Sequence, residues 1–331
     1  MSDANESILR VEGLRTWYPI RRGLLRRVVG HVQAATDVSF EIAPGRTLAL
    51  VGESGCGKST VGRSILCLEN PQEGRVEFEG RDLLSLDATS LRAARQRLQI
   101  VFQDPMASLD PRMRIRDQIA EGMHSFGIGA DEAERTARVA ELLERVQLDP
   151  RTMDRYPHEF SGGQRQRICI ARALAVDPRL IVCDESVSAL DVSIQAQILN
   201  LLRRLQEELG LSYLFITHDL SVVRYLAHEV AVMYLGRIVE RGPTERLFAH
   251  PAHPYTRALL AAIPSIDPAR RGEAPPVLGD VPSPSRPPPG CHFHTRCPVA
   301  MERCRREAPP MFAIEGGESR CFLSEAPGRA D

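Results

Sequence analysis

A glycine-rich turn between a short apolar run and an amphipathic stretch constrains this chain more than any other feature. Residues 52–59 read G-E-S-G-C-G-K-S, which fits the pattern G-x-x-x-x-G-K-[ST]. The apolar run Thr47–Val51 before it predicts a buried strand, and residues 58–68 after it predict a helix. Glycines let backbone N–H groups curl around phosphate oxygens, and the helix adds the positive end of its dipole. The pattern therefore predicts a phosphate-binding loop rather than an ordinary glycine-rich turn.

The basic residues single out the same loop. Lys58 is the only lysine, and the other basic residues, out of 42 in all, are arginines. A surface that needs only positive charge accepts arginine, whereas a site that needs a compact ammonium on a flexible stem does not. Lys58 is thus predicted to reach the β and γ phosphates, and the Ser59 hydroxyl to ligate Mg²⁺. The full set predicted to contact the nucleotide here is Gly52, Ser54, Gly55, Cys56, Gly57, Lys58, Ser59 and Thr60.

Strands and helices alternate along most of the chain. Short apolar runs at residues 98–102, 180–184 and 213–217 predict buried strands, and residues 131–146 and 193–209 predict helices. This alternation predicts an α/β fold with a mainly parallel sheet. The early segments 8–42 and 74–80 predict an antiparallel β subdomain. The basic insert at residues 21–31 predicts a solvated hairpin.

Two carboxylates follow the predicted strand at residues 180–184. Asp184 and Glu185 stand at its carboxyl end, the edge of an open α/β sheet where ligands bind. Successive strand residues point to opposite sides, so the two acids can do different work. Asp184 suits the Mg²⁺ shell and Glu185 suits the attacking water. The alternative is a strand that runs out into a charged loop.

A second glycine pair narrows the interpretation. The run Phe160-Ser161-Gly162-Gly163-Gln164 precedes a predicted helix, and Ser161 with Gln164 fits a capping box. Two glycines in a first helical turn cost stability and favour close approach of another phosphate. Here the sequence resembles the ATP-binding-cassette family, whose signature reads L-S-G-G-Q. Phe160 is a mild apolar departure from that signature.

Four further positions carry the resemblance. Gln103 matches the family's Q-loop glutamine, residues 188–191 match its D-loop with Asp191, and His218 matches the switch histidine. Tyr18 resembles the aromatic residue that stacks on adenine, with Trp17 as the rival. The resemblance implies an ATPase in which Glu185, His218 and Gln103 are catalytic, and Ser59, Gln103 and Asp184 surround Mg²⁺. It also implies that residues 161–164 of one chain close over ATP held by the loop of a second chain.

Several stretches point to one branch of the family. The runs at residues 103–105, 108–112 and 253–260 resemble the cassettes of oligopeptide and dipeptide importers. The insert at residues 21–31 also resembles one of the two paired subunits of those importers, with a solvated hairpin as the alternative reading. This resemblance implies the ATP-hydrolysing subunit of a bacterial importer at the cytoplasmic face of the cell membrane. Implied partners are a second ATPase subunit, two transmembrane permease subunits and an extracytoplasmic solute-binding protein. The solute, and the choice between homodimer and heterodimer, stay open.

Composition weighs against other classes. The net charge is −1, which gives no general attraction to nucleic acid. Apolar runs stay short of a membrane span, and the start of the chain is polar, unlike a signal peptide. The alternatives to an importer subunit are a soluble ATPase that acts on DNA or ribosomes and a regulatory ATPase without a transport role. We expect no nucleic acid partner.

Proline and cysteine define the end of the chain. Of 24 prolines, 13 lie between Pro264 and Pro327. We therefore expect a nucleotide-binding domain over residues 1–262 with a helical subdomain at about 104–175, a proline-rich linker over 263–290, and a small cysteine-rich extension over 291–331. Disulfides are not expected in the cytosol. The loose spacing of four thiols, together with a resemblance to the C-terminal cysteine motif of the peptide-importer cassettes, favours a [4Fe–4S] iron–sulfur cluster, with zinc or no metal as alternatives. The thiols are Cys291, Cys297, Cys304 and Cys321.

Overall fold

The computed structural model describes residues 7–23, 26–188, 190–263 and 279–325. The chain divides into two compact units, each built from segments that are distant in sequence. The signature unit comprises residues 1–8, 42–47 and 78–216, and the phosphate-loop unit comprises residues 9–41, 48–77 and 217–331. Of the expected linker, residues 264–278 lie outside the described residues, as does Ala189 in the expected D-loop.

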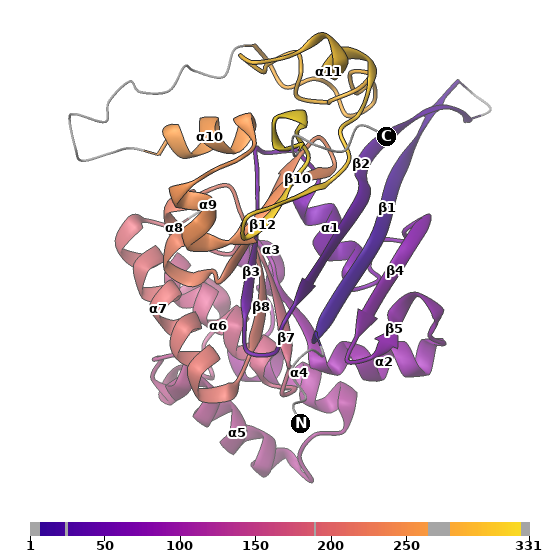
Figure 1. Cartoon of the computed structure of the whole chain (residues 1–331). Helices are drawn as coiled ribbons and strands as arrows, with labels where there is room; N and C mark the ends of the chain where they lie inside the picture. The colour runs from indigo at the N-terminus through magenta and orange to yellow at the C-terminus, as the bar shows by residue number, and fades with distance from the viewer. Residues whose placement is uncertain (1–6, 24–25, 189, 264–278, 326–331) are drawn as a thin grey trace, which may run out of the picture. The chain divides into compact units, whose positions relative to one another are not determined.

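The phosphate-loop unit contains a mixed sheet that includes both early and late segments of the chain (Figure 1). Its strands lie in the order β11 (Phe312–Ile314), β12 (Gly317–Ser319), β10 (Arg237–Pro243), β9 (Glu229–Tyr234) and β3 (Thr47–Val51). β3 and β9 pair in parallel, and the other pairs are antiparallel. The last two strands of the chain therefore extend the sheet that carries the phosphate loop.

A separate antiparallel set of strands lies in the same unit, as predicted for the N-terminal region. The order is β2 (Arg27–Ile42), β1 (Leu9–Arg22) and β4 (Glu73–Phe78). The first residues of β2 are exposed, whereas Ala35, Val38 and Phe40 in its second half are buried. The arginines on either side of the β1–β2 connection are exposed, in agreement with a solvated basic hairpin.

The helices of this unit are short, and α1 is shorter than predicted. They are α1 (Lys58–Ile65), α8 (Leu220–Leu226), α9 (Thr244–Ala249), α10 (Pro254–Ala261) and α11 (Glu302–Arg306), with a 3₁₀ turn at Phe322–Ser324. The expected helix at 58–68 ends three residues early because Cys67 adopts φ +52°, a left-handed conformation that breaks the helix.

The signature unit has a parallel three-stranded portion, with β7 (Leu180–Asp184) between β6 (Leu98–Val101) and β8 (Ser212–Thr217). Its helices are α2 (Ala88–Arg97), α3 (Pro105–Ser108), α4 (Ile115–Phe126), α5 (Glu132–Arg145), α6 (Gly162–Leu174) and α7 (Val192–Leu209). Short elements complete it: β5 (Arg81–Asp82) and 3₁₀ turns at Leu83–Ser85, Pro150–Thr152 and Pro157–Glu159. The strands fall where the apolar runs predicted them, and the α/β prediction is confirmed.

Packing in the core of the signature unit holds β7 in position. Every residue of β7 and β8 is buried. α7 packs its apolar side, which includes Leu201, Leu202 and Leu205, into this core. The buried Tyr213 hydroxyl donates to the Leu202 carbonyl at 3.0 Å, so its polar end is satisfied. Among the residues that the structure describes, no helix is both long enough and apolar enough to cross a bilayer.

A buried carboxylate in β10, for which sequence analysis assigned no role, organises the chain that follows the strand. Glu240 is 0% exposed. It accepts hydrogen bonds from Arg246 Nη1 at 2.6 Å, and from the backbone N–H groups of Ala252 at 2.9 Å and His253 at 2.8 Å. Glu240 thus holds the turn that leads into α10.

We predict that Glu240→Gln lowers the free energy of unfolding by about 3 kcal/mol, because it leaves a half-buried arginine without its counter-charge. The control is Glu207→Gln, which removes an exposed helical pair with Arg203 and should cost less than about 0.5 kcal/mol. Urea unfolding followed by circular dichroism measures both. Equal losses for the two variants would contradict a structural role for Glu240.

Candidate functional site

The phosphate loop spans the gap between the end of β3 at Val51 and the start of α1 at Lys58. Gly57 caps the helix with φ +106°, a conformation that favours glycine. A Cβ at Gly57 would lie 1.8 Å from the Ala34 carbonyl oxygen, so no other residue fits there. Backbone packing therefore fixes this glycine, in addition to the demand that a phosphate would make on it.

The Lys58 ammonium lies inside the loop. Lys58 is only 3% exposed, and its Nζ donates to the carbonyl oxygens of Gly52 at 2.8 Å and Glu53 at 3.1 Å. Burying a charge without such partners is costly. The loop backbone thus curves around a compact cation, as the sole lysine led us to expect.

The other loop residues differ in exposure. Ser54 and Gly55 are exposed, and Ser59 and Thr60 are half-buried in the first turn of α1. Cys56 is buried, and burial raises the pKa of its thiol, so Cys56 faces the loop interior as a neutral side chain. Its backbone N–H donates to the Glu53 carbonyl at 3.3 Å, so Cys56 also closes the turn of the loop.

The two aromatic residues predicted as candidates for stacking on adenine, Trp17 and Tyr18, both lie on β1. The Trp17 indole donates to Thr36 Oγ1 at 2.8 Å, and its ring lies beneath the Arg15 guanidinium at 5.0 Å. Trp17 is therefore held by its neighbours. Tyr18 is half-buried and follows Trp17 on an extended strand, so the two rings leave opposite faces.

His218 lies just beyond β8 in the phosphate-loop unit. Its side chain is exposed, although Thr217 before it is buried. The next residue, Asp219, accepts a hydrogen bond from Ser221 N at 2.9 Å and caps α8. The histidine thus stands between a buried strand end and a capped helix, where its backbone is fixed.

The acidic pair lies in the signature unit, at the end of β7. Asp184 is 3% exposed, whereas Glu185 is half-buried. Glu185 adopts φ +46°, which is uncommon for a residue with a side chain and is held by its N–H donating to Ile216 O at 2.9 Å. Strain of this kind, maintained by the surrounding sheet, redirects the carboxylate away from the strand.

Gln103 and Glu185 are brought together although 82 residues separate them. Gln103 Nε2 donates to Glu185 Oε2 at 2.9 Å. Gln103 itself is exposed beyond the end of β6, the strand that pairs with β7. Two residues assigned from separate motifs thus form one hydrogen-bonded pair at the carboxyl ends of adjacent parallel strands.

The signature residues 161–164 form the capping box that the sequence predicted. Ser161 N donates to Gln164 Oε1 at 2.9 Å, and Gln164 N donates to Ser161 Oγ at 3.3 Å. Gly163 has a packing reason as well, because a Cβ there would lie 2.4 Å from Ile194 Cγ2. Gly162 meets no such obstacle, and Phe160 is buried. Asp191, at the start of α7, is exposed.

The predicted Mg²⁺ ligands have suitable chemistry. Ser59, Gln103 and Asp184 supply hydroxyl, amide and carboxylate oxygens, the hard donors that Mg²⁺ takes, together with phosphate oxygens of the nucleotide. These donors fit a Mg²⁺–nucleotide complex, and no thiol or imidazole competes in the set.

The iron–sulfur prediction is wrong, and so is its zinc alternative. Among residues 7–23, 26–188, 190–263 and 279–325, no three His, Cys, Asp or Glu side chains are grouped so that they could hold a metal ion. The thiols of Cys291, Cys297, Cys304 and Cys321 instead line an apolar pocket with Phe293 and Phe322.

Burial there works against metal binding, because the thiolate is the metal ligand. It raises the pKa of Cys291 to about 11 and also raises the pKa of Cys297 and of Cys321. The segment is stabilised in other ways: Phe293 belongs to the core of the phosphate-loop unit, and β12 pairs with β10.

Glu53 is a loop residue to which sequence analysis assigned no role. Its carboxylate accepts two hydrogen bonds from Arg296, and its N–H donates to the Tyr255 hydroxyl. A signal was present in the sequence, since a carboxylate within an anion-binding loop is repelled by the ligand and needs a cationic partner. The partner itself, 243 residues away, had no signal.

Comparison with protein families gives two matches. Residues 35–188 match the family described as ABC transporter, and residues 239–304 match the family described as oligopeptide/dipeptide transporter, C-terminal region. The second match contains both the His253-Pro254-Tyr255 run and Arg296.

Curated relatives match over nearly the whole chain. A probable peptide ABC transporter ATP-binding protein of Sinorhizobium fredii is 51% identical over 100% of this chain and 92% of its own length. The oligopeptide transport ATP-binding protein AppF of Bacillus subtilis is 51% identical over 93% of this chain and 95% of its own length. The dipeptide transport ATP-binding protein DppF of Haemophilus influenzae is 49% identical over 96% and 97%.

Solved structures agree in fold. The ATP-binding cassette MJ0796, in a dimer bound to ADP and phosphate, has a TM-score of 0.64 at 29% identity over 71% of this chain and 98% of its own. The protein cbiO1 of Clostridium perfringens, part of an ABC transporter complex, has a TM-score of 0.63 at 28% identity over 74% and 92%. About half of the residues of this chain are identical to those of the curated transport ATP-binding proteins, over nearly its whole length. The chain therefore belongs to the ATP-binding subunits of ABC transporters and is an ATPase.

Proposed function

We propose that this ATPase drives the import of di- or oligopeptides through membrane subunits to which it binds. Support comes from relatives about 50% identical that are named for peptide, oligopeptide or dipeptide transport. The match of residues 239–304 to the C-terminal region of such transporters adds to it. The proposed place of work is the cytoplasmic face of the cell membrane, with an extracytoplasmic protein that delivers the solute.

The observation that carries the proposed chemistry is the hydrogen bond between Gln103 and Glu185. Hydrolysis of ATP transfers a phosphoryl group to water, so catalysis consists mainly of positioning and charge stabilisation. Glu185 takes the proton of the attacking water, and the Gln103 amide holds that carboxylate in one orientation. Glu185 adopts φ +46° directly after the last residue of β7.

The nucleotide is held by residues that the phosphate loop presents. Lys58 exchanges its bonds to the loop carbonyls for bonds to the β and γ phosphates, and the N–H groups at the start of α1 donate to the phosphate oxygens. When bound, Mg²⁺ would neutralise charge on the β and γ phosphates, and Ser59 and Asp184 would hold it. His218 contacts the γ-phosphate, and Tyr18 stacks on adenine.

Two ATPase subunits are proposed to face each other head to tail. Ser161 and the glycines of the signature on one chain close over the nucleotide in the loop of the second chain. The dimeric form described for MJ0796 supports this arrangement. Closure provides the mechanical step, and hydrolysis reopens the pair.

The surface proposed to meet the membrane subunits runs from Met106 to Gln118 in the signature unit. Met106 is 48% exposed, and methionine suits an adaptable contact. Buried Gln118 fixes the loop beneath it: Gln118 Oε1 accepts from Asp110 N at 2.9 Å, and Gln118 Nε2 donates to Met113 O at 2.9 Å.

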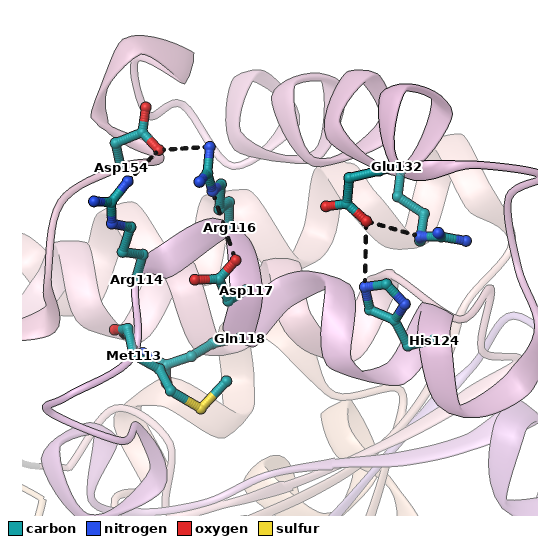
Figure 2. A network of polar contacts seen from close by, with 9 residues as sticks. Met113, Arg114, Arg116, Asp117, Gln118, His124, Glu132 and Asp154 are labelled. Carbon is teal, nitrogen blue, oxygen red and sulfur yellow. Dashed lines mark hydrogen bonds and ion pairs between the residues drawn. The ribbon is translucent and has the colours of Figure 1, made fainter.

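Ion pairs fix the flank of this surface. Figure 2 shows Asp154 contacting both Arg114 and Arg116, at 3.5 and 2.9 Å, so the start of α4 is tied to the chain before the signature. On the same helix, His124 lies 3.6 Å from Glu132 of α5. These exposed pairs add little stability, but they show which side chains of α4 lie beside the chain before the signature and beside α5.

We predict that Glu185→Gln retains ATP binding and loses turnover by about 10²–10⁴-fold, because the amide cannot take the proton while it keeps the shape of the side chain. Closed dimers should accumulate with ATP. Phosphate release and ATP binding in the assembled transporter measure the two effects, with exposed Glu144→Gln as the control. Turnover at the parental rate in Glu185→Gln would show that Glu185 is not the base.

We predict that Lys58→Arg loses nucleotide binding or turnover severely although it keeps the charge. The loop carbonyls lie 2.8 and 3.1 Å from a compact ammonium, and a planar guanidinium does not fit between them. The matched control is Arg63→Lys, the reverse exchange at an exposed position on the same helix. Near-normal ATPase activity in Lys58→Arg would contradict the argument.

We predict that a cysteine at position 106, in Met106→Cys, crosslinks to a membrane subunit in the assembled transporter. The eight native thiols are all buried or half-buried, so an exposed new thiol reacts in preference to them. Glu208→Cys, at an exposed position on α7, is the control and should not give that product. Crosslinks from position 106 only to a second ATPase subunit would overturn the assignment of this surface.

A further inference from the structure

The second residue of the phosphate loop is bound by two side chains from the last third of the chain. Glu53 N donates to Tyr255 Oη at 3.0 Å. The Glu53 carboxylate accepts from Arg296 Nη1 at 2.8 Å and from Arg296 Nη2 at 3.0 Å. We call Tyr255 and Arg296 together the Glu53 anchor; all three residues lie in the phosphate-loop unit.

The anchor is buried and packed. Tyr255 is 0% exposed, and its ring lies 4.7 Å from that of Tyr234 and 5.3 Å from that of Phe293. The Arg296 side chain is 7% exposed, and its guanidinium lies 5.8 Å from the Tyr234 ring. A two-pronged arginine–carboxylate pair with little exposure is among the stronger polar contacts in proteins. Hydrogen bonding to Glu53 raises the pKa of Arg296, so its charge is permanent.

The backbone that carries Tyr255 is itself fixed. Glu240 accepts from the N–H groups of Ala252 and His253. His253 Nδ1 then accepts from Tyr255 N at 3.0 Å. Burial lowers the pKa of His253 to about 3, which keeps this ring nitrogen free to accept at neutral pH. Two buried hydrogen bonds, from His253 N to Glu240 and from Tyr255 N to His253, thus fix the backbone that carries the Tyr255 ring.

Glu53 is therefore held from two directions. From inside the loop, Lys58 Nζ contacts the Glu53 carbonyl. From outside, the anchor holds both its N–H and its carboxylate. Because the Glu53 N–H is bonded to Tyr255, it is not among the loop groups that donate to a phosphate. The paired carboxylate also no longer repels an anion as a lone charge would.

We propose that Tyr255 and Arg296 are positioning residues for ATP, which act through Glu53 to hold the phosphate loop in its binding conformation. This gives the C-terminal region of the chain a role in nucleotide affinity, and it rests on the proposed function of the loop. A loop that is already ordered loses less conformational entropy when the triphosphate binds. The anchor should therefore affect binding of ATP more than the rate of its hydrolysis.

The test uses Tyr255→Phe and Arg296→Ala in the assembled transporter. Each should raise KM for ATP on the order of tenfold, with kcat at saturating ATP within about twofold, because each removes a buried hydrogen-bond partner of the loop. The full-length purified subunit should show the same loss in its Kd for ATP. Arg296→Lys, which keeps the charge but loses the second prong, should fall between Arg296→Ala and the parent.

A double-mutant cycle separates positioning from loss of structure. Glu53→Ala combined with Arg296→Ala should bind ATP no more weakly than the weaker single variant, because both remove the same contact. The control is Arg306→Ala, which breaks an exposed pair with Glu302 in the same segment and should leave KM unchanged.

Two results would overturn the inference. One is an unchanged KM in both Tyr255→Phe and Arg296→Ala while the parent hydrolyses ATP normally. The other is an additive double variant, which would indicate independent structural damage. Failure of the proposed function looks different, since the unaltered transporter would then show no ATPase activity coupled to peptide uptake.

Discussion

The buried ammonium of Lys58 is the interaction on which the phosphate-loop unit depends. A cation that is 3% exposed is tolerable only where the surrounding backbone supplies oxygen ligands, and the carbonyls of Gly52 and Glu53 do so. Those carbonyls can turn inward only if the chain reverses within a few residues, which Gly57 permits at φ +106° against the Ala34 carbonyl. The turn after strand β3, the glycine at position 57 and the buried lysine therefore depend on one another. Without the glycine the chain could not turn, and without the turn the carbonyls could not bind the ammonium.

Local signals in the sequence were sufficient wherever one short segment determined the outcome. Uninterrupted apolar runs placed β3 and β7, because a strand buried on both faces has no other composition. Ser161 and Gln164 placed the start of α6, because their capping box involves only neighbouring residues. The end of α1 was missed, since the left-handed turn at Cys67 has no residue type that marks it.

Distant contacts were beyond the reach of the sequence. The spacing of Cys291, Cys297, Cys304 and Cys321 suggests a shared metal, but spacing does not determine whether the surroundings of four neighbouring thiols are polar or apolar. Here the backbone N–H of Cys291 donates to the Cys304 carbonyl at 2.8 Å, while the side chains enter an apolar pocket with aromatic rings. The role of Arg296 could not be predicted for a similar reason. It is one of 41 arginines in the sequence, and only the fold brings it to Glu53.

The predicted catalytic pair and the phosphate loop lie in different units, and the two differ in whether C-terminal residues contact them. In the signature unit, Gln103 and Glu185 form a hydrogen-bonded pair just beyond the carboxyl ends of two adjacent parallel strands. In the phosphate-loop unit, by contrast, the sheet runs from β3 through β10 to β12, and Phe293 shares a core with Val51. The C-terminal segment is therefore part of the structure that holds the phosphate loop. Glu240, His253 and Tyr255 link β10 to Glu53 through hydrogen bonds, so the position of the phosphate loop depends on the position of that segment.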